Sequence, residues 1–242
     1  MTQRTIAERA AVGVAKALFA VGYAWPGSQF FGRTVIAGDD AREVALTYDD
    51  GPNDPYTLRL LEILAHHNVR ATFFLIGKFV RQRPEITRQI RAAGHLVGNH
   101  TMTHPVLLQQ SPQGVREELA GCNAAIEDAT GEPVRFFRPP HGVRCPDILR
   151  AAGELGLTPV MWNATGRDWT ALSPEEILDR LKLKVSINQR RKKGSNILLH
   201  DGGQDHLGVD RGPTLEVTRR LLESWSKTEC QFVTVEKWVS QS

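Results

Sequence analysis

Seven short apolar runs recur along the chain, separated by stretches with the spacing of amphipathic helices. The runs are rich in β-branched and aromatic residues and cover residues 43–48, 71–77, 95–98, 134–138, 158–162, 196–200 and 231–235. Runs of this length and composition, bounded by polar or turn-forming residues, predict β-strands. Strands that alternate with helices predict a parallel α/β sheet.

The segments between the runs carry start and stop signals of helices. Residues 56–68 place leucines at helical spacing, and residues 83–94 begin beside a proline and stop at a glycine. Residues 111–131 and 173–181 each open with a serine cap and a proline suited to the first turn. The strand count is near the eight of a closed barrel, and no GxGxxG turn follows the first strand. A (β/α) barrel is therefore favoured over a doubly wound dinucleotide fold.

Composition is that of an ordinary globular protein. The chain has 242 residues, of which 41% are hydrophobic and 24% charged, and single α/β barrels commonly reach this length. The net charge of +3 is too small to indicate nucleic acid as a partner. The basic run at residues 189–194 is interpreted as a solvated loop, with contact to an anionic polymer or lipid surface as the alternative. The three cysteines form neither a CxxC pair nor a disulfide framework.

The N-terminal segment is apolar and helical in pattern, but charged residues interrupt it. The uninterrupted part after Lys16 is too short to span a bilayer, and no clear small-residue cleavage site follows it. We expect a helical segment within residues 1–38 packed on or beside one domain of residues 39–242. An interfacial membrane helix is the second choice and a cleaved signal the third. The expected location is cytoplasmic or membrane-associated, with export by an unrecognised route as the alternative.

Ionisable residues gather at the carboxyl ends of the predicted strands. Asp49 and Asp50 follow the first strand, and the later strands are followed by His100, His104, Arg138, Asp168 and His200. Barrel enzymes build their active sites from the loops at this end. Strand alternation that ends in a turn further predicts that the carboxylates of Asp49 and Asp50 point in different directions. The pattern therefore predicts one site shared by residues far apart in sequence.

The histidine pair in the segment HTMTH suits a metal ion. Pro105 disfavours a helix here, so His100 and His104 are expected on a loop after the strand. Hydrogen-bonded loop histidines are the alternative. Two imidazoles and a carboxylate from the first strand leave positions open for water, as a catalytic zinc site requires, and other divalent transition metals suit the same ligands. The second pair, His66 and His67, lies at a helix end far from this face and is not expected to bind metal.

Arg138 and His200 each allow a functional and a structural interpretation. Arg138 ends an apolar strand, where it is either a surface residue or the partner of a carboxylate whose orientation and charge state it fixes. A lone histidine such as His200 is often a satisfied core residue, but its place on the same rim favours catalysis. Asp168 can hold the imidazolium form and raise its pKa, so that it donates a proton near neutral pH.

Five segments, taken together, resemble the motifs of the polysaccharide deacetylases, which are carbohydrate esterase family 4 or the NodB-homology group. They are TYDDGP (47–52), HTMTH (100–104), RPPHG (138–142), TGRDW (165–169) and ILLHD (197–201). The family patterns are TFDDGP, H-[ST]-x-x-H, RPPYG, DxxDW and LxxH. All five occur in order within residues 43–238, so the resemblance is highly specific. It implies a distorted (β/α) barrel of about seven parallel strands and metal-dependent removal of acetyl groups from sugars.

The resemblance also implies roles for individual residues. The implied metal ligands are Asp50, His100 and His104. The implied general base is Asp49, which Arg138 orients, and the implied general acid is His200, which Asp168 supports. Zinc is the first expectation for the single divalent ion, with cobalt, manganese, nickel and iron as alternatives.

The remaining implied roles concern the oxyanion and the acetyl group. The backbone N–H of His141 would help to bind the oxyanion, and Trp169 with Leu198 would line the acetyl pocket. His141 and Thr165 depart from the family's usual Tyr and Asp, which leaves substrate contacts open. Tyr48 in place of Phe is a milder departure.

The expected function is hydrolysis of N-acetyl groups on poly- or oligosaccharides that contain N-acetylhexosamine, chitin-like or peptidoglycan-like. Residues 39–242 would form the catalytic domain. Removal of O-acetyl groups from xylan or related esters is the second hydrolase hypothesis, and a glycan-binding barrel without catalysis is the rival from another class. A phosphatase reading lacks a phosphate-binding glycine loop. The expected partner is an acetylated glycan; membrane-surface contact through the N-terminal segment is an alternative, and oligomeric state is not predicted.

Overall fold

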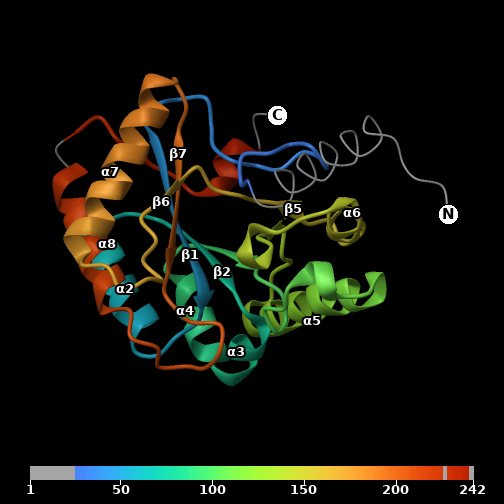
Figure 1. The fold of residues 1–242 in the computed structure, drawn as a ribbon. Helices are drawn as coiled ribbons and strands as arrows, with labels where there is room; N and C mark the ends of the chain where they lie inside the picture. Colours follow the sequence, from blue (N-terminus) through green and yellow to red (C-terminus); the bar gives the residue numbers. More distant parts are fainter. Residues whose placement is uncertain (1–24, 226–227, 240–242) are drawn as a thin grey trace, which may run out of the picture.

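One curled sheet of parallel strands organises the protein (Figure 1). The computed structural model describes residues 25–225 and 228–239. The sheet order is β5-β4-β3-β2-β1-β7-β6, and β8 pairs with the start of β1. The strands are β1 (Glu43–Gly51), β2 (Thr72–Leu75), β3 (Leu96–Asn99), β4 (Phe136–Phe137), β5 (Thr158–Pro159), β6 (Ala164–Thr165), β7 (Ser195–His200) and β8 (Gln231–Phe232).

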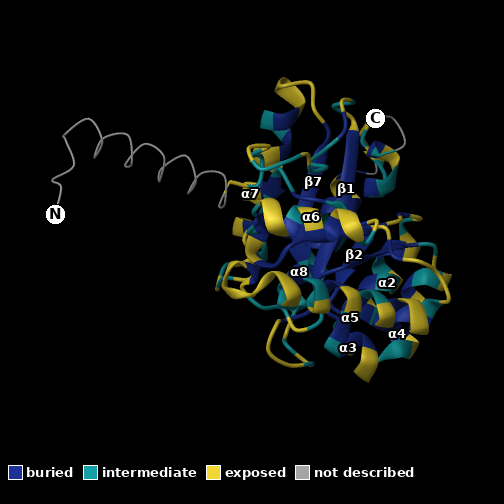
Figure 2. Ribbon diagram, turned by 90° about the vertical axis from the view of Figure 1, so that its right-hand side faces the viewer, coloured by how far each residue is buried: buried dark blue, intermediate teal, exposed yellow. Residues whose placement is uncertain are grey.

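Helices cover the outside of the sheet, and Figure 2 shows buried strands inside with exposed positions on the outer helix faces. They are α2 (Tyr56–His66), α3 (Gly77–Gln82), α4 (Pro84–Ala92), α5 (Pro112–Thr130), α6 (Pro146–Glu154), α7 (Pro174–Arg190) and α8 (Gly212–Trp225), with short 3-10 turns η1 (Leu107–Gln109), η2 (Pro140–Gly142) and η3 (Val235–Trp238). The predicted serine caps are confirmed. Ser111 accepts from the Gly114 backbone N–H, and Ser173 forms a capping box with Glu176.

The two outer strands of the sheet, β5 and β6, are joined by residues 160–163 alone. Five peptide steps reach at most roughly 18 Å, so the sheet must curl until its edges approach one another. The expected distorted barrel of parallel strands is thereby confirmed. The set of strands differs from the prediction in two respects. β6 was not predicted, and the strand predicted at residues 231–235 is the two-residue β8, which pairs with β1.

Alternation along β1 separates an outer apolar layer from the barrel interior. Its outward side chains pack with the helices and are Val44, Leu46 and Tyr48. The Tyr48 hydroxyl lies 3.0 Å from Thr218 Oγ1 on α8, which accounts for a tyrosine at this position. Ala45 faces the other way, into an interior cluster with Phe74 and Val160. Thr47 and Asp49 continue this inward series toward the carboxyl end, where the sheet carries polar groups.

The N-terminal segment is described only from residue 25 onward. Residues 25–38 form turns and an isolated parallel bridge between Val35 and Val160. The predicted helix and its alternatives lie mainly in residues 1–24, outside the described residues. Within the described part of the chain, no helix combines the length and apolar character needed to cross a membrane. All three cysteines are free thiols, as predicted.

Candidate active site

A cavity of about 670 Å³ opens at the carboxyl ends of the strands. Eight of the ten predicted site residues line it: Asp49, Asp50, His100, His104, His141, Trp169, Leu198 and His200. The other two lie behind the wall, since Arg138 and Asp168 are both buried. The structure therefore brings all ten predicted positions together. His66 and His67 are not among the lining residues, as expected.

Asp49 and Arg138 form a buried ion pair beneath the cavity. Arg138 Nη1 donates to Asp49 Oδ1 at 2.8 Å, and the two side chains are 0% and 4% exposed. Burial lowers the pKa of Arg138, and the charge of Asp49 opposes that shift. An arginine keeps its proton in such a site. Asp49 is thus held in one orientation beside a permanent positive charge.

Arg138 is itself fixed by the barrel interior. Its guanidinium lies 4.2 Å from the Phe74 ring centre, a cation–π distance. Further acceptors of its N–H groups are Thr47 Oγ1, Asn196 Oδ1 and the carbonyls of Val160 and Met161. Sequence reasoning missed Thr47 and Asn196. Period-two spacing from Asp49 and His200 was the signal that could have found them.

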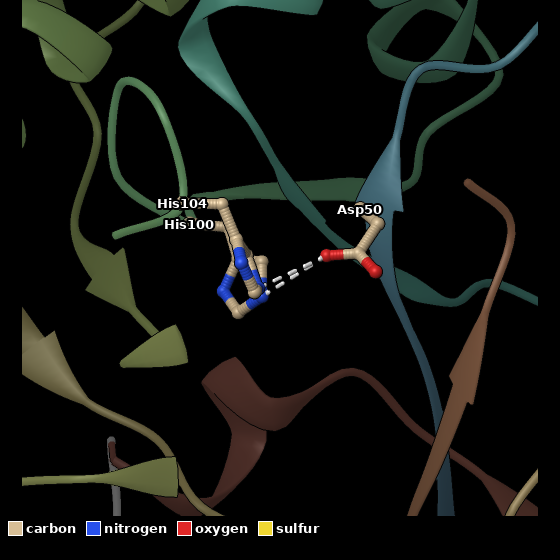
Figure 3. A group of neighbouring side chains, drawn as sticks. All are labelled: Asp50, His100 and His104. Carbon is tan, nitrogen blue, oxygen red and sulfur yellow. Dashed lines mark ion pairs between the residues drawn. The ribbon is translucent and has the colours of Figure 1, made fainter. Parts of the chain in front are cut away.

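A backbone irregularity turns Asp50 out of the strand alternation. Asp50 has φ of 71°, and the β1–β2 register shifts between Asp49 and Gly51. Its Oδ1 lies 3.4 Å from Nε2 of both His100 and His104. Figure 3 shows the two imidazoles side by side, facing this carboxylate. The prediction that alternation points the two carboxylates in different directions is therefore wrong in its reason: both residues line the cavity, and His100 Nε2 is also 3.8 Å from Asp49 Oδ2.

These three side chains can hold a metal ion. Their ligand atoms lie within 4.8 Å of one another. His100 Nδ1 donates to the Arg138 carbonyl at 2.7 Å, which places the ring's lone pair on Nε2, toward Asp50. Asp50 Oδ1 is buried and has no hydrogen-bond partner among the described residues. A buried carboxylate oxygen without a donor is costly, and a cation held by these residues would satisfy it. The donor set therefore fits a divalent metal.

The site electrostatics match that reading. Burial raises the pKa of the Asp50 carboxyl, but the neighbouring His100, His200 and His104 outweigh it and hold the pKa below its ordinary value. Burial lowers the pKa of His104 to about 3. His104 is consequently neutral at neutral pH, which is the form that coordinates a metal.

His200 is held against Asp168 on the opposite wall. Asp168 Oδ1 lies 2.9 Å from His200 Nδ1, and Asp168 Oδ2 accepts from the His200 backbone N–H and the Thr214 hydroxyl, each at 2.8 Å. Burial lowers the pKa of His200, but Asp168 and the more distant Asp50 and Asp49 outweigh it and raise the pKa to about 9. The imidazole is therefore protonated at neutral pH.

Aromatic and apolar groups shape the mouth of the cavity. Trp169 is 44% exposed and packs edge-on against His200 with ring centres 5.1 Å apart. Leu198 is buried in β7, and Trp162 adds a second indole to the lining. Thr165, which departs from the family pattern, accepts from the backbone N–H of Arg167 and so shapes the loop that carries Asp168.

The loop after β7 supplies the remaining wall, and Asn53 anchors it. Asn53 Nδ2 donates to the Asp201 and Val209 carbonyls at 2.9 Å, and its Oδ1 accepts from the Gly208 N–H at 2.6 Å. The loop residues that line the cavity are Gly203, Gln204, Asp205, His206, Val209 and Arg211. Sequence reasoning missed Asn53, because nothing local to it reveals partners about 150 residues away.

Comparison with known proteins agrees with the fold. Residues 37–160 match the sequence model of the family described as polysaccharide deacetylase. A chitooligosaccharide deacetylase of Sinorhizobium fredii is 41% identical over 167 residues, covering 69% of this chain and 75% of that protein.

Solved structures share the barrel. A peptidoglycan N-acetylglucosamine deacetylase superimposes with a TM-score of 0.75 at 27% identity, covering 91% of this chain and 94% of that one. A CE4 family pseudoenzyme from Bacillus anthracis gives a TM-score of 0.72 at 28% identity, covering 82% and 65% of the two chains. Together with the match over residues 37–160, these similarities establish that the chain belongs to the polysaccharide deacetylase family, carbohydrate esterase family 4.

Proposed function

We propose that this protein is a metal-dependent hydrolase that removes N-acetyl groups from poly- or oligosaccharides containing N-acetylhexosamine. The observation that carries the proposal is the arrangement of side chains around one cavity. An arginine-held carboxylate, Asp49, and an aspartate-held imidazole, His200, flank three side chains suited to a metal. The activities named for the relatives, on chitooligosaccharides and peptidoglycan, support the substrate class.

An amide carbonyl is a poor electrophile, and a metal ion is one way to activate it. The residues that would hold the ion are Asp50, His100 and His104. When bound, a divalent ion supplies Lewis acidity, which lowers the pKa of a water and polarises a carbonyl. We propose zinc, with cobalt, manganese, nickel or iron as substitutes that the same ligands suit.

Asp49 is placed to act as the general base. Its Oδ1 is occupied by Arg138, whereas its Oδ2 faces His100 across the proposed metal site. Oδ2 would take a proton from the attacking water, whose oxygen then bonds to the acetyl carbon. The backbone N–H of His141 would donate to the developing oxyanion, and such a donor is typically worth roughly 3 kcal/mol.

His200 is placed to act as the general acid. Its Nδ1 is engaged by Asp168, so the proton that it can give lies on Nε2. That proton would go to the sugar nitrogen as the carbon–nitrogen bond breaks, leaving acetate and a free amine. Trp169 and Leu198 would enclose the acetyl methyl group on the same side of the cavity.

Two rival functions predict different experimental results from the proposed one. The same groups suit an O-acetyl ester, and the pseudoenzyme neighbour demonstrates that this fold does not by itself ensure catalysis. Acetate release should be measured from chitooligosaccharides and from acetylxylan, after metal stripping and reloading with zinc. Release from chitooligosaccharides that depends on zinc supports the proposal. Release from acetylxylan alone, or tight glycan binding without acetate at any zinc loading, would overturn it.

A further inference from the structure

Arg144 joins two segments that are distant in sequence, and its side chain is buried. Its Nη1 donates to the Gly142 carbonyl at 3.0 Å. Its Nη2 donates to the carbonyls of Trp25 and Ser28, both at 2.7 Å, and reaches that of Pro26 at 3.3 Å. One guanidinium therefore links the turn at residues 25–28 to the loop at residues 139–143.

The loop that Arg144 holds has a demanding backbone. His141 and Gly142 both adopt left-handed conformations, with φ of 57° and 68°. A side chain on Gly142 would meet the Trp162 ring at 2.6 Å, so the loop also lies close against the cavity wall. A non-glycine residue in this region persists only where surrounding contacts enforce it. Within the loop, backbone bonds from Gly142 to Pro139 and from Val143 to Pro140 provide part of that enforcement.

The turn at residues 25–28 is suited to receive a cation. The Ser28 N–H donates to the Trp25 carbonyl at 2.9 Å, which closes the turn. Three carbonyls then converge on the same nitrogen of Arg144. Hydrogen bonds from a charged donor are stronger than neutral ones and favour this fixed geometry. The turn also lies outside the segment that matches the family, which begins at residue 37.

We propose that Arg144 is a positioning residue that ties the turn at 25–28 to the catalytic loop and thereby holds the His141 backbone N–H in place. Its effect on rate rests on the proposed function, whereas the tie itself rests on the geometry alone. A segment outside the matched family domain thus supports the proposed oxyanion donor. Neither the turn nor Arg144 contributes a metal ligand.

The test compares two ways of breaking the tie in the full-length chain. Arg144→Leu removes the guanidinium, and deletion of Gly27 displaces the carbonyls of the turn. Arg91→Leu is the control for loss of an arginine, because Arg91 also donates to a backbone carbonyl, that of His95, and pairs with Glu132, but before β3 at the opposite end of the sheet. Should Arg144→Leu fail to fold, Arg144→Lys replaces it, since a single ammonium cannot bridge both segments.

Hydrogen exchange of the peptide spanning residues 139–144 is the first readout. Both tie-breaking variants should exchange at least about 10-fold faster there, and the control should match wild type. Unchanged exchange in both variants would overturn the proposal, whether or not the chain is an active deacetylase. Wild-type chain that releases no acetate would refute the proposed function and leave the tie to be judged by exchange.

The kinetic readout separates positioning from loss of folded protein. With rates expressed per zinc-loaded enzyme, kcat should fall at least about 10-fold, while KM and zinc affinity stay within about threefold. The double variant should be no slower than the slower single variant, because both changes break the same link. Unchanged kcat in both variants, or additive losses in the double variant, would contradict the proposed role.

Discussion

Arg138 and Asp49 form an ion pair at 2.8 Å at the top of the barrel interior, with almost no solvent access to either side chain. The pair explains how two adjacent aspartates can end a buried strand. The Arg138 guanidinium balances the charge of Asp49. Asp50, whose backbone is left-handed, departs from the side-chain alternation of the strand and faces two imidazoles. Asp49 thus has its own source of positive charge, whereas Asp50 faces the two imidazoles, where a metal ion held by these residues would supply one.

The Arg138–Asp49 pair should matter for folding as well as for catalysis. Arg138→Met leaves Asp49 buried without its partner, and removing one member of a buried pair typically costs about 3–5 kcal/mol. Urea unfolding should show this loss. Arg116→Met is the control, because Arg116 pairs with Glu154 on the surface and should change little. Equal losses of unfolding free energy in the two variants would show that the buried pair stabilises the fold no more than the surface pair does.

Metal binding should stabilise the folded chain through Asp50. Zinc at 100 times its dissociation constant should add about 2.7 kcal/mol to the wild-type free energy of unfolding. Asp50→Ala should lose most of this gain, while His67→Ala, outside the cavity, should keep it. Melting temperature measured against zinc concentration gives the comparison. An undiminished gain in Asp50→Ala would exclude the proposed ligand set.

The pH dependence should report His200. Burial lowers the pKa of His200, but Asp168, with smaller contributions from Asp50 and Asp49, outweighs it and raises the pKa from 6.5 to about 9. Stability from this pairing is fully present below the unfolded pKa and is lost as pH rises through about 9. Activity that needs the protonated imidazole should fall over the same upper range.

Asp168→Asn provides the matching variant. It removes the charge that raises the His200 pKa, so the alkaline limb of the kcat profile should move to lower pH. Profiles of both proteins between neutral pH and pH 10 check this. If the alkaline limb falls at the same pH in both proteins, then Asp168 does not control the group that titrates there.

Trp169 and Leu198 should respond differently to truncation, although both line the cavity. Trp169 is 44% exposed, so Trp169→Ala should raise KM with little change in unfolding free energy. Leu198→Ala should cost about 2–5 kcal/mol because it leaves a void in a buried strand. Steady-state kinetics and urea unfolding, done side by side, test the contrast. A large stability loss in Trp169→Ala would argue for a core role instead.

The site was easiest to predict from the sequence at the first strand, which is long and ends in charged residues. Asp49 and Asp50 close a nine-residue strand, and period-two alternation with a sharp end is readable over such a length. By contrast, β6 comprises only Ala164 and Thr165, which is too short to show any period. Its place is set by pairing with β7, a tertiary effect.

Supporting residues were less predictable than the reacting ones. Asn53 and Arg144 bind backbone carbonyls far away in sequence, and an isolated asparagine or arginine carries no pattern that names such partners. The left-handed φ of Asp50 also has no signal in a non-glycine residue. It coincides with the β1–β2 register shift between Asp49 and Gly51, which depends on tertiary pairing.

Acetate release from N-acetylated chitooligosaccharide by zinc-reloaded Asp49→Asn, measured beside wild type and with bound zinc quantified, tests the proposed mechanism. Asp49 is proposed to take the proton from water without binding the metal. Wild type should release acetate, and the variant should hold the same zinc while turning over at least about 100-fold more slowly. A variant that keeps the wild-type rate, or one whose inactivity follows from lost zinc, would contradict the assignment of Asp49 as the base.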